Sequence, residues 1–353
     1  MDKDIIMRYK HVYVLCPPNS VTGGPDALHQ MVYYLHGLGV NSSIAYISYL
    51  CNPNIISIQE PYKRYVDEYV CDQDIIDSRD IAIVIPEAYA YLSERYKMAS
   101  VFIWWLSVDN RRIKYNSIKK LIVLGSAPFR YLSYGHKDKK HFMLSLKNRL
   151  KHNEYSFLHE KENVQHLCAS YYALDIISKK TSNKYHKCIE PISKLFLEEY
   201  KKYCFSLKDD RNNIILYNPA KCGKFIQYLS SLYPQFEFLP LKGYTQRQLI
   251  EKYKEAKLYV DFGPFPGAER IPKEAVLYGC AIITGKHGAS GYHGDVPINN
   301  AYKFDESEVD VISKQIQYVL DNYQTIYSDF DEYRQTILCL EEKYNNDLSA
   351  IFK

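Results

Sequence analysis

The chain has 353 residues, of which 46% are hydrophobic and 24% are charged, with a formal net charge of +4 at pH 7. This length favours two domains of ordinary size, and the composition is that of a globular protein. The small net charge does not indicate a nucleic-acid partner, and no stretch approaches the roughly 18 consecutive apolar residues of a membrane span.

The first half of the chain alternates short strand-like runs with amphipathic segments. Its N-terminus places charges before an apolar run too short for a secretory signal, so we expect this run to be the first strand. Residues 23–39 carry a helical apolar stripe, with Pro25 suited to the first turn and Gly37 suited to the end. The strand-like runs lie at 11–17, 42–50, 80–86, 100–108, 120–127 and 165–180. Their alternation with amphipathic segments predicts a parallel sheet.

The polar segment 181–188 is the expected linker, after which the same alternation restarts. The second half predicts helices within 225–233, 247–256 and 272–279 and from Ser307 onward, and strands at 213–220, 236–243, 257–263 and 280–285. We expect domains over 1–180 and 181–330, and a C-terminal helix within 331–353 that packs back on the first domain. Doubly wound sheets of this kind bind ligands at the carboxyl ends of their strands.

The most informative motif is DFGPFPGAERIPKEAVLYGCAIITG, residues 261–285. A strand ends at Phe262, a loop rich in Gly and Pro follows, and Pro272 opens a helix whose N-terminal amides suit an anion. We interpret the motif as a diphosphate cradle, with Glu274 in the first helical turn accepting hydrogen bonds from a ribose. The alternatives are a helix-capping carboxylate for Glu274 and a solvated surface pair for Glu269 and Arg270.

This segment resembles the donor-binding motif of retaining glycosyltransferases with the GT-B fold, in which a glycine-rich loop precedes Glu-Ala-x-x-x-Gly and an apolar strand. The resemblance implies two Rossmann-like domains facing across a cleft. It also implies that Glu274 contacts the ribose and that the loop from Gly263 to Gly267 lies near the sugar and phosphates. The family's other acidic residue stands eight positions before the helix glutamate, where this chain has Pro266. Glu269 is the nearest carboxylate, so the paired-glutamate mechanism does not carry over intact.

Two further segments of the second half are candidates for donor binding. Lys221 and Lys224 lie at a predicted strand-to-helix turn, where similar enzymes place basic residues and where ammonium groups neutralise a diphosphate. Two solvated lysines are the alternative there. The loop 285–295 contains four glycines together with Lys286 and His287, and glycine lets a backbone approach a ligand closely. A mobile loop is the alternative.

In the first half, Gly23 and Gly24 resemble the double-glycine loop of GT-B enzymes, whose backbone approaches the donor phosphate or the acceptor. A plain tight turn is the alternative, and the absence of G-x-G-x-x-G disfavours a dinucleotide site. Glu87 and Asp109 follow two predicted strands, and Asp109 is suited to bind or deprotonate an acceptor hydroxyl. Together with Glu269 they are the candidate catalytic carboxylates, and ordinary solvated loop carboxylates are the alternative.

Residues 136–152 combine many cations with apolar side chains. Such a segment suits the anionic inner face of a cytoplasmic membrane carrying a lipid-linked acceptor, and an ordinary surface helix is the alternative. The nine cysteines include no C-x-x-C pair, which indicates reduced thiols in a cytoplasmic protein. We expect no metal and no other cofactor.

These observations predict a metal-independent GT-B glycosyltransferase that moves a hexosyl or related group from a nucleotide-diphosphate sugar to a saccharide or lipid-linked acceptor. Similarity to bacterial enzymes implies a role in surface polysaccharide biosynthesis, such as capsule or lipopolysaccharide. One alternative is a sugar-nucleotide epimerase of the same fold, which would need no acceptor. Another is a non-catalytic nucleotide-sugar-binding or scaffold protein.

Overall fold

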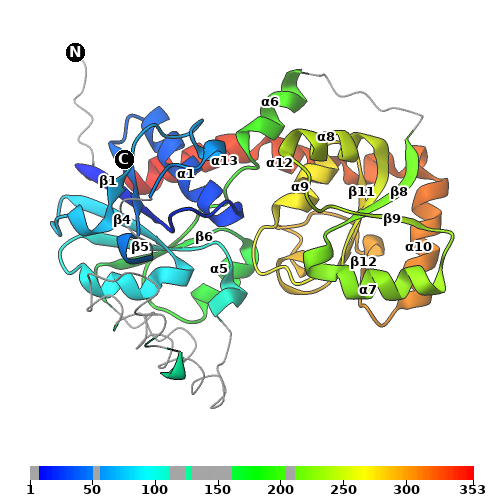
Figure 1. The fold of residues 1–353 in the computed structure, drawn as a ribbon, viewed down its shortest axis with the longest axis horizontal. Coiled ribbons are helices and arrows are strands. Elements are labelled where there is room, and N and C mark those ends of the chain that lie inside the picture. Colours follow the sequence, from blue (N-terminus) through cyan, green and yellow to red (C-terminus); the bar gives the residue numbers. More distant parts are fainter. Residues whose placement is uncertain are drawn as a thin grey trace. The chain divides into compact units, whose positions relative to one another are not determined.

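The computed structural model describes residues 8–50, 56–111, 124–126, 128, 143, 161–202 and 211–353. The chain divides into two compact units, one formed by Met1–Glu190 with Glu342–Lys353 and the other by Pro191–Glu341. Each unit contains one parallel sheet with helices, as labelled in Figure 1. The predicted α/β class with two parallel sheets is therefore confirmed.

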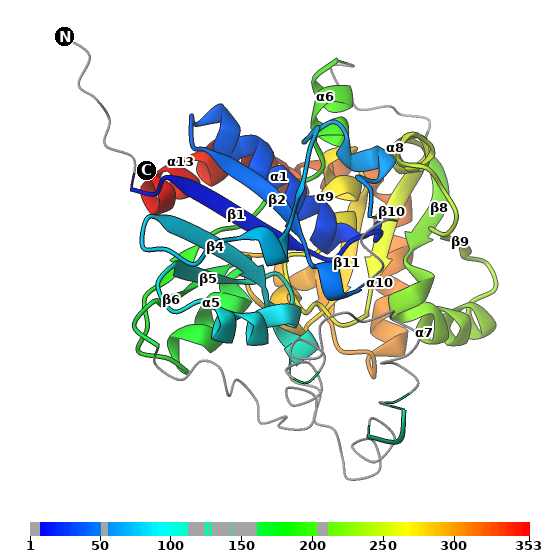
Figure 2. The same cartoon turned by 60° about the vertical axis from the view of Figure 1, so that its left-hand side comes forward.

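The described part of the first unit forms a seven-stranded sheet in the order β3-β2-β1-β4-β5-β6-β7. Figure 2 shows β1 running between β2 and β4, and β1 pairs in parallel with both. The chain order therefore reverses between β1 and β4, which makes this the topological switch point of the sheet. The strands are β1 His11–Cys16, β2 Ser42–Tyr46, β3 Val70–Cys71, β4 Ile81–Pro86, β5 Ser100–Trp105, β6 Val164–Cys168 and β7 Tyr185–Lys187.

Helices and short 3-10 turns connect these strands. The α-helices of the first unit whose bounds lie within the described residues are α1 Gly23–Gly37, α5 Tyr171–Ser178 and, for the most part, α13 Leu340–Phe352. The 3-10 turns are η1 Ser48–Leu50, η3 Glu60–Tyr62, η4 Asp72–Asp74, η5 Glu87–Arg95 and η6 Val108–Arg111.

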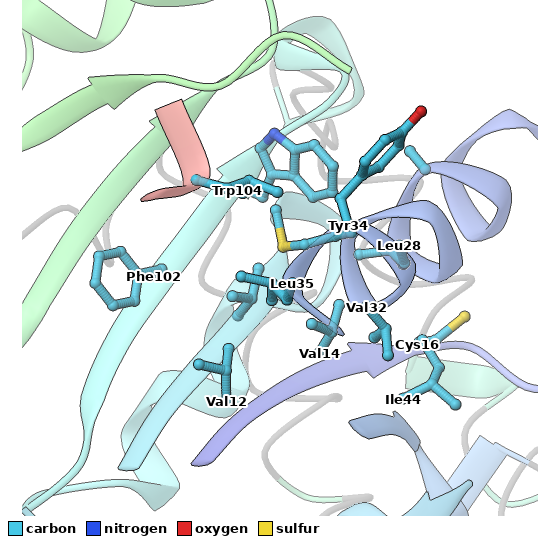
Figure 3. Packing of buried hydrophobic residues seen from close by; sticks show 14 of the residues in the cluster. Val12, Val14, Cys16, Leu28, Val32, Tyr34, Leu35, Ile44, Phe102 and Trp104 are labelled. Atoms are coloured by element: carbon cyan, nitrogen blue, oxygen red, sulfur yellow. The ribbon is translucent and has the colours of Figure 1, made fainter. Parts of the chain in front are cut away.

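The core of the first unit lies where α1 packs on β1 and its neighbours (Figure 3). Alternate residues of β1 and every third or fourth residue of α1 supply it, as the two periodicities require. Helix α13 adds Tyr344, whose ring stacks on Trp104 at 6.3 Å between centroids and meets Tyr34 edge-on at 5.4 Å. The end of the chain therefore completes a core that its beginning starts.

The sheet of the second unit has the order β12-β11-β10-β8-β9, and all of its pairings are parallel. The switch point of this sheet lies between β8 and β10. The strands are β8 Asn212–Tyr217, β9 Glu237–Pro240, β10 Ala256–Asp261, β11 Ala281–Gly285 and β12 Lys303–Phe304. The helices are α6 Lys194–Lys202, α7 Pro219–Leu232, α8 Gln246–Glu255, α9 Arg270–Leu277, α10 Val309–Asp321, α11 Tyr323–Ile326 and α12 Asp331–Leu338, with 3-10 turns η7 Gly288–Gly291, η8 Asn300–Tyr302 and η9 Tyr327–Phe330.

Three element predictions are wrong. The strand expected over 165–180 ends at Cys168, because the Ser170 side chain accepts a hydrogen bond from the Ala173 amide and caps α5. The expected linker 181–188 contains β7, which pairs with β6. Within the expected strand 120–127, the described residues Leu124 and Gly125 are helical.

The basic segment 136–152 lies outside the described residues except for Met143. Over the part of the chain that the structure does describe, none of the helices combines the length and the apolar character needed to cross a membrane.

Candidate functional site

At the switch point of the second unit, the turn after β8 and the loop after β10 lie against each other. Asn218 caps α7 by accepting a hydrogen bond from the Ala220 amide at 3.1 Å, which starts the helix directly after β8. A Cβ atom on Gly263 would lie 2.5 Å from the Lys221 Cβ atom. Only glycine permits so close an approach, so Gly263 brings the β10 loop against the beginning of α7.

Lys221 and Glu269 form an ion pair across this junction, and their side chains are 21% and 22% exposed. The Lys221 ammonium group also donates to the Pro264 carbonyl at 3.4 Å and lies 5.6 Å from the centre of the Phe265 ring. Burial raises the pKa of the Glu269 carboxyl, and the Lys221 charge opposes that rise. The surface pair considered for Glu269 and Arg270 is therefore wrong, because Glu269 contacts α7 instead.

Asp261 is a second carboxylate at the same place, and the sequence analysis did not single it out. It is 1% exposed and accepts hydrogen bonds from the Tyr259 hydroxyl at 2.8 Å and the Gly263 amide at 3.1 Å. Burial raises the pKa of Asp261, while these hydrogen bonds and Lys221 lower it. The only sequence signal was an acidic residue ending an apolar strand.

Glu274 lies deeper than expected, in the interior between α8 and α9. Because α9 begins at Arg270, Pro272 is the third residue of the helix and Glu274 the fifth, so its expected place in the first turn is wrong. Glu274 is 4% exposed, and one carboxylate oxygen accepts a hydrogen bond from the Tyr253 hydroxyl at 3.2 Å. Arg270 Nε lies 3.8 Å from the other oxygen. The carboxylate is thus held in one orientation by two neighbours.

The loop that begins at Gly285 is fixed to the β10 loop. The Ala289 amide donates to the Phe265 carbonyl at 2.8 Å, and Gly288 adopts a left-handed φ of 61°. A Cβ atom on Gly288 would lie 2.8 Å from the Phe265 carbonyl carbon and closer still to its oxygen. Glycine is therefore required here, and it sets how near the two loops lie.

The remaining donor-site candidates of the second unit differ in their surroundings. Gly267 is buried in the β10 loop, whereas Lys224 and His287 are exposed. Lys286 is also exposed, and its ammonium group lies 3.4 Å from Asp305 and 3.5 Å from Glu308. The structure therefore groups Lys221 with the β10 loop and pairs Lys286 with carboxylates instead.

In the first unit, Gly23 and Gly24 are the first two residues of α1. The Tyr62 hydroxyl holds the preceding turn by donating to the Thr22 carbonyl and accepting from the Thr22 amide, each at 3.1 Å. A Cβ atom on Gly24 would meet no atom within 4 Å. Packing among the described residues gives no reason for glycine at this position.

Glu87 and Asp109 lie at the carboxyl ends of β4 and β5, at the same edge of the sheet. Glu87 is 4% exposed and accepts a hydrogen bond from the Leu106 amide at 3.2 Å. Asp109 accepts one from the Tyr172 hydroxyl at 2.9 Å. The alternative of a solvated loop carboxylate is therefore wrong for Glu87, and Tyr172 fixes one oxygen of Asp109.

Lys303 on β12 is a buried cation that the sequence analysis also missed. It is 5% exposed, and its ammonium group donates to the Val296 carbonyl at 2.8 Å. Burial lowers the pKa of Lys303 to about 8, against an opposing effect of Asp295. Between this pKa and the higher value of an unfolded lysine, the unfolded chain binds more protons, so this group makes the protein more stable as the pH rises.

We expect Lys303→Met to abolish this contribution. From about pH 7.5 to about pH 10, wild type should gain on the order of 2 to 3 kcal/mol in its free energy of unfolding relative to the variant. Urea unfolding at several pH values measures this difference, and Lys242→Met, at an exposed position, is the control. A difference that stays constant with pH would show that Lys303 titrates normally.

No three or more His, Cys, Asp or Glu side chains gather in a metal-binding arrangement among the residues for which the structure gives positions.

Comparison with known proteins finds no matching family model and no matching curated protein. Solved structures do match. Sucrose-phosphate synthase from Thermosynechococcus elongatus has a TM-score of 0.57 and 10% identity, covering 97% of this chain and 98% of that one. The trehalose-6-phosphate phosphatase N-terminal domain from Candida albicans has a TM-score of 0.55 and 9% identity, covering 98% and 97%. The pneumococcal O-GlcNAc transferase GtfA, in complex with UDP and GlcNAc, has a TM-score of 0.55 and 7% identity, covering 98% of each chain. At these identities the similarity concerns the fold.

Proposed function

We propose that this chain, which has the GT-B fold, is a glycosyltransferase that uses a nucleotide-diphosphate sugar as its donor. The observation that carries the proposal is the position of Lys221, beside the glycine-rich loop at the switch point of the second unit. Ligands of doubly wound sheets bind at such points. The GtfA structure, which shares the fold, contains UDP and a sugar.

In this proposal the second unit binds the donor. The Lys221 ammonium group neutralises the diphosphate as it leaves, with Lys224 on the next turn of α7 as a further cation. Glu274, held by Tyr253 and Arg270, accepts a hydrogen bond from the ribose. These cations supply the positive charge that the leaving diphosphate needs, and we therefore propose a metal-independent reaction.

The first unit presents the acceptor. Asp109, held by Tyr172, accepts the proton of the acceptor hydroxyl while the oxygen bonds to the sugar carbon and the diphosphate departs. Gly24 leaves space beside the first turn of α1 for a ligand. We propose a saccharide or lipid-linked acceptor in bacterial surface polysaccharide biosynthesis, on the resemblance of the 261–285 motif to such enzymes.

A thermal-shift screen tests the donor site. The purified protein is heated with UDP, GDP, CDP and dTDP, with their glucose conjugates, and with NAD, in buffer containing EDTA. We expect one nucleoside diphosphate to stabilise the protein selectively, and Glu274→Ala to lose that effect. Glu251→Ala, in an exposed pair with Lys254 on α8, is the control and should keep it.

The same samples separate the alternatives. Release of nucleoside diphosphate only when an acceptor is added supports transfer, and sugar isomerisation without an acceptor indicates an epimerase. Binding without any turnover indicates a scaffold, and no stabilisation by any nucleotide would overturn the donor site altogether.

A further inference from the structure

The ammonium group proposed to bind the diphosphate already has a carboxylate partner. Lys221 projects from the first turn of α7, and Glu269 reaches it from the N-cap position of α9. Glu269 makes no side-chain hydrogen bond to its own helix. Its carboxylate therefore pairs with Lys221 and does not cap the N-terminus of α9.

Three charged side chains and one neutral phenol, from four elements, lie around the Glu269 carboxylate. These are Lys221 of α7, Asp261 of β10, Lys273 of α9 and, as a buried phenol, Tyr333 of α12. When Glu269 and these three charged side chains are ionised, two lysines balance two carboxylates. An arriving nucleotide sugar adds two negative charges to this neutral group, and protonation of one carboxylate offsets one of them.

We propose that Glu269 is a displaceable counter-ion: it holds Lys221 before the donor binds, releases Lys221 to the diphosphate, and takes up a proton as it does so. This inference rests on the proposed function, since it concerns the same donor site. In this proposal Glu269 positions Lys221 and does not itself contact the sugar.

The exchange balances in atoms and charge. The hydrogen bond from Lys221 Nζ to the Glu269 carboxylate breaks, and one from Nζ to a phosphate oxygen forms. A proton from solvent binds the carboxylate, which has lost its cation and gained a negative neighbour. When the nucleoside diphosphate leaves, the proton returns to solvent and the Lys221–Glu269 pair forms again.

Two features of the structure favour this exchange. Glu269 is only about one-fifth exposed, so an unpaired negative charge would be poorly solvated there. Burial and the neighbouring Asp261 already raise the pKa of Glu269, and Lys221 and Lys273 hold it down. Loss of the Lys221 contact therefore shifts the carboxyl toward its protonated form.

Isothermal titration calorimetry tests the proton uptake. The probe is whichever of UDP-glucose, GDP-glucose, CDP-glucose and dTDP-glucose stabilises the protein in the screen. Nucleotide sugars are chosen because each of their phosphates has one ester and one anhydride bond, so each keeps a single, strongly acidic oxygen that stays ionised at neutral pH. Titrations in buffers of different ionisation enthalpy should show uptake of up to one proton, and affinity should fall by up to about tenfold per pH unit above neutrality.

Glu269→Gln removes the charge and keeps the shape of the side chain. We expect it to bind the nucleotide sugar about tenfold more tightly at pH 8, with no proton uptake. Glu251→Gln is the matched control and should behave as wild type, since its partner Lys254 lies on the same helix. Thermal unfolding without ligand checks that both variants fold. The number of protons taken up is measured on the wild-type protein, so this part of the test does not depend on the folding of a variant.

The results distinguish failure of this inference from failure of the proposed function. Binding of a nucleotide sugar without proton uptake overturns the inference and leaves the donor site standing. Weaker binding by Glu269→Gln also overturns it, because that result would place Glu269 in contact with the donor. If none of the four nucleotide sugars binds, the proposed function fails and the inference fails with it.

Discussion

Lys221→Met is expected to lower kcat/KM for the nucleotide sugar by about 100- to 1,000-fold, the loss seen when one group that stabilises a developing charge is removed. The expectation follows from the place of Lys221, the cation that Gly263 allows to lie directly against the β10 loop. Methionine keeps most of the apolar length of the side chain, so packing against Phe265 should change little. Release of nucleoside diphosphate, followed over a range of donor concentrations, measures the loss.

Lys224→Met is the comparison variant on the same helix, because Lys224 is proposed as a further cation for the diphosphate but is exposed and lies outside the junction with the β10 loop. We expect it to change kcat/KM by no more than about threefold, as an exposed charge is screened by solvent and salt. Equal losses in the two variants would mean that the general positive charge of α7 matters and that the junction with the β10 loop does not.

Gly288→Ala is expected to give the largest loss of stability, about 3 to 5 kcal/mol. Two costs combine at this residue. Its φ of 61° is unfavourable for any residue with a Cβ atom, and that atom would overlap the Phe265 carbonyl. To remove this overlap, the loop that begins at Gly285 would have to move away from the β10 loop. That movement would break the hydrogen bond from the Ala289 amide to the Phe265 carbonyl.

Gly243→Ala separates the two costs, because Gly243 has a similar φ of 80° in the same unit but no atom within 4 Å of the position that an added methyl group would occupy. It should lose only about 1 kcal/mol. Unfolding is best followed by far-ultraviolet circular dichroism, since both tryptophans, Trp104 and Trp105, lie in the first unit. Similar losses in the two variants would show that the loops separate easily.

The elements that the sequence predicted well are those whose pattern is local. The apolar stripe of α1 follows a period of 3.6 residues, and the runs of β4 and β10 are short and apolar. The strand expected at 165–180 was wrong because an apolar run does not show where a strand stops and a helix starts. Ser170 was the local sign of that boundary.

The contacts of the candidate site were harder to predict, because they join residues far apart in the chain. Between Lys221 and Glu269 the chain runs through the rest of α7, β9, α8 and β10, and the β8–β10 pairing brings the two residues together. The motif spacing drew attention to Pro266, and Glu269 was predicted as a candidate catalytic carboxylate and not as the partner of Lys221. Tyr253 could not be matched to Glu274 from sequence, since the packing of α8 on α9 decides that contact.

The last helix, α13, has a consequence for how the chain is made. The first unit comprises residues up to Glu190 together with Glu342–Lys353, so the second unit is inserted within it. A ribosome releases the whole of the second unit before it releases Tyr344, Leu348 and Phe352, which close the core of the first. Domains generally fold as units during synthesis. The second unit is therefore complete before the first, and the apolar surface around Trp104 stays uncovered until α13 has been synthesised.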